Sequence, residues 1–233
     1  MAKRVVLIKH ERSPGDDRAA TWLAENGFEL DWRFPYDGDS LEAPGGDMAG
    51  TVLYGGPHSI PDVEQHPHLA EEARWVNLCI ERELPTLGFC LGGQVIAHAL
   101  GAEVRPGLHG YHEFGYYPLQ STEAGRAVIP DGLYVTQAHF HEFEIPEGAV
   151  HLAGSVLFAN QAFQYGERTF AFQFHPEQTV EGLRRWQAAE WAPWDKPGVQ
   201  SRAEQDAVAE QHDAAQDAWF RGFLAKLFGQ TKG

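Results

Sequence analysis

A cysteine between glycines is the first group in this sequence whose type and surroundings could do chemistry. Cys90 stands in TLGFCLGGQ, residues 86–94, where a buried strand is expected to pass into a helix. Such a corner needs small neighbours, and Gly88 and Gly92 meet that need as in the G-x-S-x-G elbow of hydrolases. A helix N-terminus also activates a thiol. The spacing favours a nucleophile, while tight packing alone is an alternative explanation.

A base for this cysteine follows much later in the chain. In FAFQFHPE, residues 170–177, an apolar strand delivers His175 to a loop, and Glu177 comes two residues afterwards. A carboxylate at that spacing can fix the imidazole tautomer and stabilise the imidazolium. We therefore predict a Cys90, His175, Glu177 triad; the alternative is a surface His-Pro turn.

Two backbone N–H groups are candidates for binding an oxyanion. The N–H of Leu91 lies at the expected helix start, directly after the cysteine. A second donor is expected from the Gly55-Gly56-Pro57 turn, because it follows a predicted strand that ends at the same sheet edge. An ordinary turn is the alternative for this segment.

The elements that must position these groups indicate an α/β protein. Continuous apolar runs predict buried strands, and helical patterns alternate with them, which is typical of a doubly wound, mostly parallel sheet flanked by helices. The expected strands are residues 4–9, 28–33, 51–54 and 85–90, and the expected helices run from about 16 to 26, 67 to 83 and 91 to 100.

The second half of the chain changes texture to short strands and turns, followed by two amphipathic helices. We expect strands at residues 114–120, 133–138, 151–158, 161–165 and 169–174, which include a small antiparallel region, and helices at 179–191 and 201–228. Helical spacing predicts core packing for Val208, Ala215, Trp219, Phe223 and Leu227. The predicted division is a domain over 1–181 and a helical extension over 182–233 that packs on it.

Composition limits the partners. The formal charge of −15 on 233 residues disfavours nucleic acid and anionic membranes as partners. No apolar run approaches a membrane span, so a cytoplasmic location is expected. Neither a P-loop nor G-x-G-x-x-G is present, and we expect no cofactor. Cys79 is expected to pack as a small buried hydrophobe and not to form a disulfide.

Taken together, GFCLGGQ, FQFHPE and YGGPHS resemble the class I glutamine amidotransferase family, and within it the glutaminase domain of GMP synthases, over residues 3–181. The resemblance implies a flavodoxin-like sheet, with Cys90 as nucleophile, His175 as general base and acid, and Glu177 as the third member. It also implies an oxyanion hole at Gly56 and Leu91. Gln94 and Gly55 would help to hold a glutamine substrate.

One segment departs from the family pattern. In QAHFHEFEIP, residues 137–146, His139 matches, but Phe140 and His141 stand where Gly and Asp are usual. These three residues are the expected contacts to the amino-acid end of the substrate. The histidines of this region, with His109, His112 and Glu113, lack the spacing of a metal site, and we expect no metal.

Three functions remain open. The first is a glutaminase that supplies ammonia to a separate synthase, which the family resemblance implies. The second is a self-sufficient hydrolase of a γ-glutamyl amide or peptide, which the changed Phe140-His141 pair favours. The third is a non-catalytic binding protein of the same fold. Whether the chain forms a homodimer stays open as well.

Overall fold

The chain is built around one eight-stranded sheet in the order β2-β1-β3-β4-β12-β11-β10-β7. The structure is a computed structural model and describes residues 3–229. From one edge to the other the strands are β2 (Glu29–Arg33), β1 (Arg4–Ile8), β3 (Met48–Leu53), β4 (Thr86–Phe89), β12 (Thr169–Phe172), β11 (Ala162–Tyr165), β10 (Val150–Gly154) and β7 (Gln120–Ser121). The first five are parallel, and antiparallel pairs complete the other edge.

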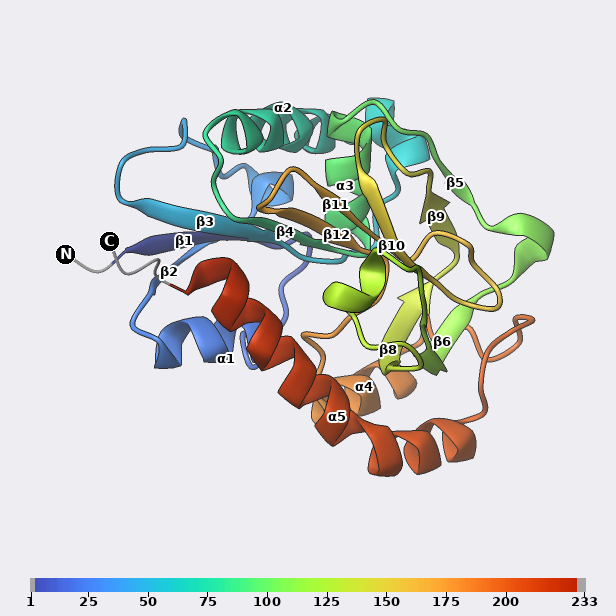
Figure 1. Cartoon of the computed structure of the whole chain (residues 1–233). Coiled ribbons are helices and arrows are strands. Elements are labelled where there is room, and N and C mark those ends of the chain that lie inside the picture. The colour runs from blue at the N-terminus through green and yellow to red at the C-terminus, as the bar shows by residue number, and fades with distance from the viewer. Residues whose placement is uncertain (1–2, 230–233) are drawn as a thin grey trace.

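Helices cover both faces of this sheet (Figure 1). On one face, α2 (Pro67–Glu81) and α3 (Leu91–Ala99) bury apolar residues against the strands, and on the other α1 (Arg18–Glu25) and α5 (Arg202–Phe228) do so. Alternate residues of β1 follow this division, because Val5 and Leu7 belong to one core cluster and Val6 and Ile8 to the other. The predicted doubly wound, flavodoxin-like fold is confirmed.

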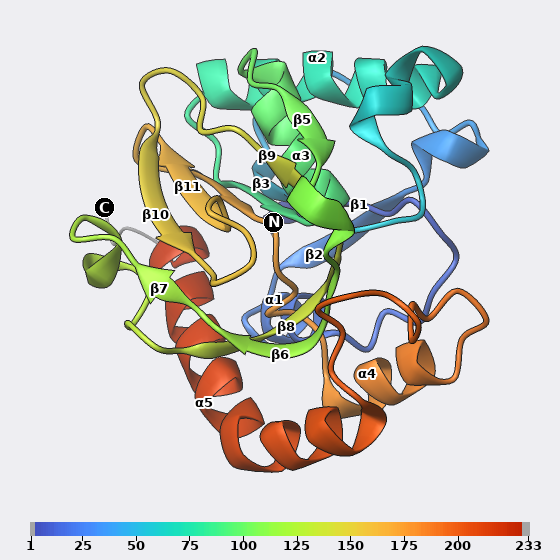
Figure 2. The ribbon, with the colours of Figure 1, turned by 90° about the vertical axis from the view of Figure 1, so that its right-hand side faces the viewer.

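Two small antiparallel pairs lie beside the main sheet. One joins β6 (Glu113–Pro118) to β8 (Tyr134–His139), and the other joins β5 (Val104–Pro106) to β9 (His141–Phe143). In the view of Figure 2, β6 and β8 lie between the main sheet and the two last helices, α4 (Val180–Gln187) and α5. Strand β8 is therefore held between the sheet and the C-terminal part of the chain.

Most predicted elements appear within a few residues of their expected bounds. Helix α4 is an exception, because it ends at Gln187 and not at Trp191. Trp191 therefore lies in the connection to α5. The predicted buried face of α5 is wrong at Ala215, which is exposed, whereas the neighbouring Gln216 is fully buried. Strands β5, β7 and β9 are additions to the prediction; each has only two or three residues.

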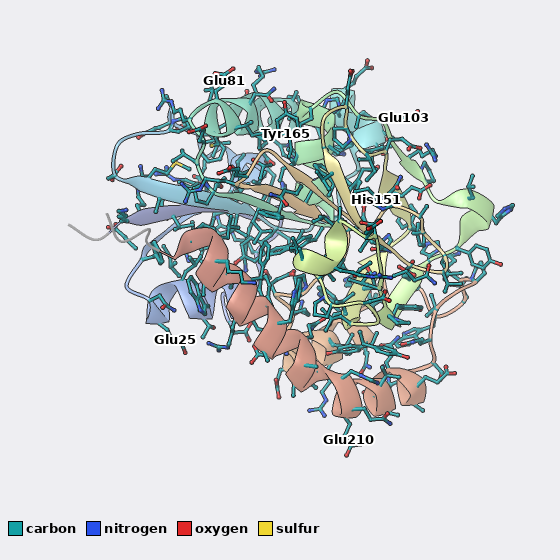
Figure 3. All side chains as sticks on the ribbon, viewed as in Figure 1. Glu25, Glu81, Glu103, His151, Tyr165 and Glu210 are labelled. Carbon is teal, nitrogen blue, oxygen red and sulfur yellow. The ribbon has the colours of Figure 1, made fainter. Side chains whose placement is uncertain are left out.

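The surface carries the acidic charge of the chain. Glu25, Glu81, Glu103 and Glu210 are exposed and point away from the body of the molecule at well-separated places (Figure 3). Among residues 3–229, no helix is long and apolar enough to cross a membrane. The division of the chain at residue 181 stays a prediction, although Phe220 and Leu224 of α5 share a core cluster with the sheet.

Candidate active site

Three loops that carry the predicted site residues leave neighbouring parallel strands. Strand β3 leads to Gly55 and Gly56, β4 leads directly to Cys90, and β12 leads to His175. Because β3, β4 and β12 are adjacent and parallel, their carboxyl ends meet at one edge of the sheet, where open α/β folds place their sites. A backbone hydrogen bond holds two of these strand ends together, since Cys90 N–H donates to Phe172 O at 2.8 Å.

Cys90 occupies a strained corner. Its φ of 49° and ψ of −110° are unusual for a residue with a side chain, and α3 begins at the next residue. The flanking glycines are needed sterically: a Cβ on Gly88 would lie 2.5 Å from backbone atoms of Gly92, and one on Gly92 would lie 2.2 Å from the Leu53 carbonyl oxygen. The predicted need for small neighbours is confirmed.

His175 is held between a carboxylate and the cysteine. Its Nδ1 lies 2.7 Å from Glu177 Oε1, and both side chains are buried. Burial by itself would lower the pKa of His175, but the neighbouring Glu177 and Cys90 outweigh it and raise this pKa to about 10. The histidine backbone is fixed by donation from its N–H to Thr136 O on β8 at 2.8 Å. The imidazole is therefore oriented from both sides, and Glu177 favours its charged form.

The glycines after β3 lie in close contact with this histidine. A Cβ on Gly55 would lie 2.7 Å from His175 Cε1, and one on Gly56 would lie 2.4 Å from the Cβ of His10. His10 in turn pairs with Glu72 at 2.7 Å, and both side chains are completely buried behind the loop. Only glycine fits at either position without a shift of the loop or of the neighbouring histidine.

Leu91 and Gln94 follow the cysteine on α3. As the first residue of the helix, Leu91 has a backbone N–H with no partner inside α3. Gln94 is buried and its side-chain amide donates to Gln173 Oε1 at 3.2 Å. Both residues line a cavity of about 650 Å³ that also contains Cys90, His175 and Glu177 in its wall.

The three expected contacts on the 139–141 segment have different surroundings. His139 is buried, and its Nε2 lies 3.1 Å from Glu113 Oε2, which also accepts from Gln161 at 2.7 Å. Phe140 is 45% exposed and lines the cavity. His141 lies 3.2 Å from Ser59 Oγ. The imidazole of His139 thus belongs to a buried polar network, and Phe140 is the member of the three with free apolar surface.

Several cavity residues were not predicted. They come from the first loop, from the residue before β6, from the end of α4 and from the segment after α4, and they include Lys9, His112, Arg185, Trp186, Trp191 and Lys196. Trp186 packs edge-on against the His175 ring at 4.8 Å between centroids. No local motif marks these positions; the tryptophan-rich composition of the C-terminal part was the one available signal. Within residues 3–229, no cluster of three or more metal-ligating side chains is arranged to hold a metal ion.

Arg18, which was not predicted either, supports the loop of Glu177 from outside the cavity. The backbone N–H of Arg18 donates to Glu177 O at 2.8 Å, and its guanidinium donates to Gln178 O and, at 3.4 Å, to Pro176 O. The same guanidinium is anchored on α5 by Asp213. This contact connects the C-terminal helix to the candidate triad.

Comparison with known proteins assigns this architecture to a family. The model of the family "Glutamine amidotransferase class-I" matches residues 21–184. The glutamine amidotransferase-like protein YfeJ of Salmonella typhimurium is 31% identical over 189 residues, 77% of this chain and 78% of that protein. A protein of Methanoculleus marisnigri that is named as one subunit of a GMP synthase is 33% identical over 61% of this chain and 76% of its own length. A GMP synthase of Streptococcus equi is 37% identical over 55% of this chain, which is 24% of the longer protein.

Solved structures agree over nearly the whole chain. A glutamine amidotransferase from Thermotoga maritima superposes with a TM-score of 0.86 at 26% identity and covers 99% of this chain and 100% of its own. Another from Methylobacillus flagellatus gives 0.85 at 25% identity, covering 100% and 98%. The likeness extends through α5, beyond the residues that the family model matches. With the family model matching well over half of its residues, this chain belongs to the class I glutamine amidotransferase family.

Proposed function

We propose that this chain hydrolyses a side-chain carboxamide of the glutamine type through a thioester on Cys90. The observation that carries the proposal is the placement of His175: its Nδ1 lies 2.7 Å from Glu177 Oε1, and its ring lies beside Gly55 together with Cys90, in the wall of the same cavity. A cysteine at a helix start, a histidine and an orienting carboxylate are the parts that nucleophilic amide hydrolysis requires.

The reaction follows from these positions. The Cys90 thiolate attacks the amide carbon, a C–S bond forms, and the carbonyl electron pair moves onto oxygen, where the N–H groups of Leu91 and Gly56 stabilise the charge. His175 gives its proton to the leaving nitrogen as the C–N bond breaks. Water then attacks the thioester and passes a proton to His175, so that the free acid and the Cys90–His175 pair are restored.

In this proposal the remaining predicted residues hold the substrate. Gln94, Gly55 and Phe140 line the cavity that contains Cys90, and residues 138–141 form part of its wall. The Ala138 carbonyl lies 3.9 Å from the Cys90 sulfur, so this segment contacts the reacting amide. His139 acts on the substrate only through that backbone, because its ring is paired with Glu113.

Delivery of ammonia to a separate synthase is a second candidate for the biological role. It is favoured by the relative named as one subunit of a GMP synthase, which this chain matches over most of that relative's length. A partner of this kind predicts slow glutamine hydrolysis by the chain alone and faster hydrolysis when the synthase is added.

The test compares two cysteines of the same chain. Cys90→Ala should abolish ammonia release from glutamine and labelling by a glutamine-like diazoketone, measured by mass spectrometry. Cys79→Ala is the matched control, because Cys79 is fully buried on α2 and burial raises the pKa of its thiol to about 12. Full activity of Cys90→Ala would disprove the cysteine mechanism. An intact protein that neither reacts with the diazoketone nor releases ammonia would favour a non-catalytic binding protein.

A further inference from the structure

The cavity around Cys90 extends well beyond the space that a primary amide needs. At about 650 Å³ it lies in the middle of the range of roughly 300–1,000 Å³ in which proteins enclose drug-sized ligands. Part of its wall comes from the end of α4 and the connection to α5, where Trp186 and Trp191 line it. This part of the cavity needs an occupant larger than ammonia.

The side of the cavity that receives the leaving group follows from the mechanism. A general acid must reach the departing nitrogen within hydrogen-bond distance, so the amine leaves on the side of His175. Trp186 packs edge-on against the His175 ring at 4.8 Å, and Trp191 packs against Trp186 at 6.2 Å. Both tryptophans therefore lie on the leaving-group side.

Trp191 offers apolar surface that the fold itself does not cover. Its side chain is 57% exposed, although the ring is held in place by an edge contact with Phe114 at 5.9 Å. The backbone next to it is also hydrogen-bonded, since Ala192 N–H donates to Ala189 O at 3.2 Å. A large aromatic ring that is both positioned and exposed at a cavity is suited to bind a planar apolar group.

The charges of the cavity restrict the amine further. Besides His175, which is paired with Glu177, its lining contains three Lys and Arg side chains, and each is already engaged: Lys9 donates to Ser13 and Pro14, Arg185 pairs with Asp16 at 2.8 Å, and Lys196 pairs with Asp195 at 3.3 Å. Glu11 and Glu190 add negative charge. A leaving group with a carboxylate would meet acidic side chains and no free cation among these lining residues.

We propose that the substrate is a γ-glutamyl amide whose amine carries an aromatic, uncharged or cationic group, and that Trp186 and Trp191 form the subsite for that group. The proposal rests on the proposed amide hydrolysis for the position of the leaving group. It assigns the segment after α4 a role in specificity. The alternative, a docking surface for a protein partner, becomes an outcome of the test.

Binding is measured in the Cys90→Ala background, so that the result does not depend on turnover. Calorimetry would compare γ-glutamyl benzylamide, γ-glutamyl ethylamide and γ-glutamylglutamate. Burial of the additional ring is expected to give the benzylamide at least a tenfold lower Kd than the ethylamide, since a buried aromatic contributes roughly 1.5–3 kcal/mol and 1.4 kcal/mol is tenfold. γ-Glutamylglutamate should bind more weakly than either.

Two tryptophan variants in the same background locate the effect. Trp191→Ala should bring the benzylamide and ethylamide affinities to within about threefold of each other, because the benzyl ring then loses its aromatic contact. Trp194→Ala is the control, because Trp194 is similarly exposed at 40% and also packs on Phe114, but lies outside the cavity lining. It should keep the full preference.

The outcomes separate this inference from the hydrolysis itself. Equal binding of the two amides, tighter binding of γ-glutamylglutamate, or loss of the preference in Trp194→Ala as well as Trp191→Ala would overturn the aromatic subsite. Equal binding is also what a protein-docking face predicts. Ammonia release from glutamine by the unmodified chain is scored separately, so an inactive Cys90 would count against the mechanism even where the benzylamide preference is found.

Discussion

Asp213 on the last helix forms an ion pair with Arg18, and Arg18 also donates hydrogen bonds to the backbone of the loop that carries Glu177. The Nη2 atom of Arg18 lies 2.7 Å from both carboxylate oxygens of Asp213, and the side chains are 7% and 20% exposed. Asp217, one turn further along α5, adds a contact at 3.0 Å to Arg18 Nε. The long C-terminal helix is thus connected by charge to the candidate triad, and not only by apolar packing.

Loss of this contact should affect the triad. In Asp213→Asn the guanidinium loses one of its two carboxylate partners and keeps Asp217, so the cost in stability should stay below the roughly 3–5 kcal/mol of a buried charge left unpaired. We expect kcat to fall about tenfold with KM changed less than twofold, because Glu177 and not the substrate cavity is displaced. Steady-state kinetics at a temperature well below the melting point of the variant would measure this.

The control for that variant is another ion pair between the same two helices. Arg221 and Glu25 join α5 to α1 at 2.8 Å, but they are 38% and 56% exposed. Glu25→Gln should leave kcat unchanged and cost less than about 1 kcal/mol. Equal effects of the two substitutions on kcat would show that Asp213 only stabilises the fold.

The pH profile of Glu177→Gln tests how the charge of His175 is maintained. The folded-state pKa is raised from 6.5 to about 10, so the imidazolium proton, and the stability it contributes, is lost only as the pH rises through that value. Without the carboxylate, the burial that lowers this pKa is opposed by Cys90 alone. We expect the alkaline limb of kcat/KM to move toward neutral pH and kcat to fall about 100-fold or more. An unmoved alkaline limb would contradict this electrostatic role.

Gly55 should be intolerant of a single added carbon. A Cβ there would lie 2.7 Å from His175 Cε1 and 3.5 Å from Cys90 Cβ, so Gly55→Ala has to displace the histidine or the loop. We expect a loss of activity of about 100-fold or more, as when one oxyanion donor is removed, with a small change in the melting temperature. Gly46→Ala is the matched control, since nothing lies within 4 Å of the Cβ it would add. Activity of Gly55→Ala near that of the control would argue against the close approach of the two loops.

The protein should be less stable with alanine than with glycine at position 90. With φ at 49° and ψ at −110°, any side chain is strained at the corner, at a cost of roughly 1–3 kcal/mol, whereas glycine adopts this conformation freely. Glycine also increases the entropy of the unfolded chain, which offsets part of this gain. The free energy of unfolding of Cys90→Gly should therefore exceed that of Cys90→Ala by about 1 kcal/mol.

Denaturant melts of both variants would measure the difference. The same pair of substitutions at Cys79, in the interior of α2, should have the opposite sign, because glycine is about 1 kcal/mol less favourable than alanine in a helix. If alanine is the more stable residue at both positions, the corner at Cys90 holds no strain.

The sequence by itself determined the parts of the site that local pattern encodes. Apolar runs that end in glycines, in Cys90 or in a His-Pro turn are strands that deliver loops, and parallel strands bring such loops to one edge. The number and order of these strands were sufficient to predict the doubly wound sheet. The need for glycine at 88 and 92 was also readable, because a strand-to-helix corner leaves no room for a Cβ whatever surrounds it.

Only the tertiary structure decided which polar groups meet. On α5, Gln216 is buried and Ala215 is exposed, because the Gln216 side chain binds Thr136 on β8. The backbone N–H of Thr136 donates to Gln216 Oε1 at 2.6 Å. A helical pattern of hydrophobic residues cannot indicate such a contact. His139 is turned toward Glu113 by a strand pairing. Trp191 reached the cavity because α4 ends early. These outcomes depend on contacts between distant segments, whose energies arise only when the elements pack.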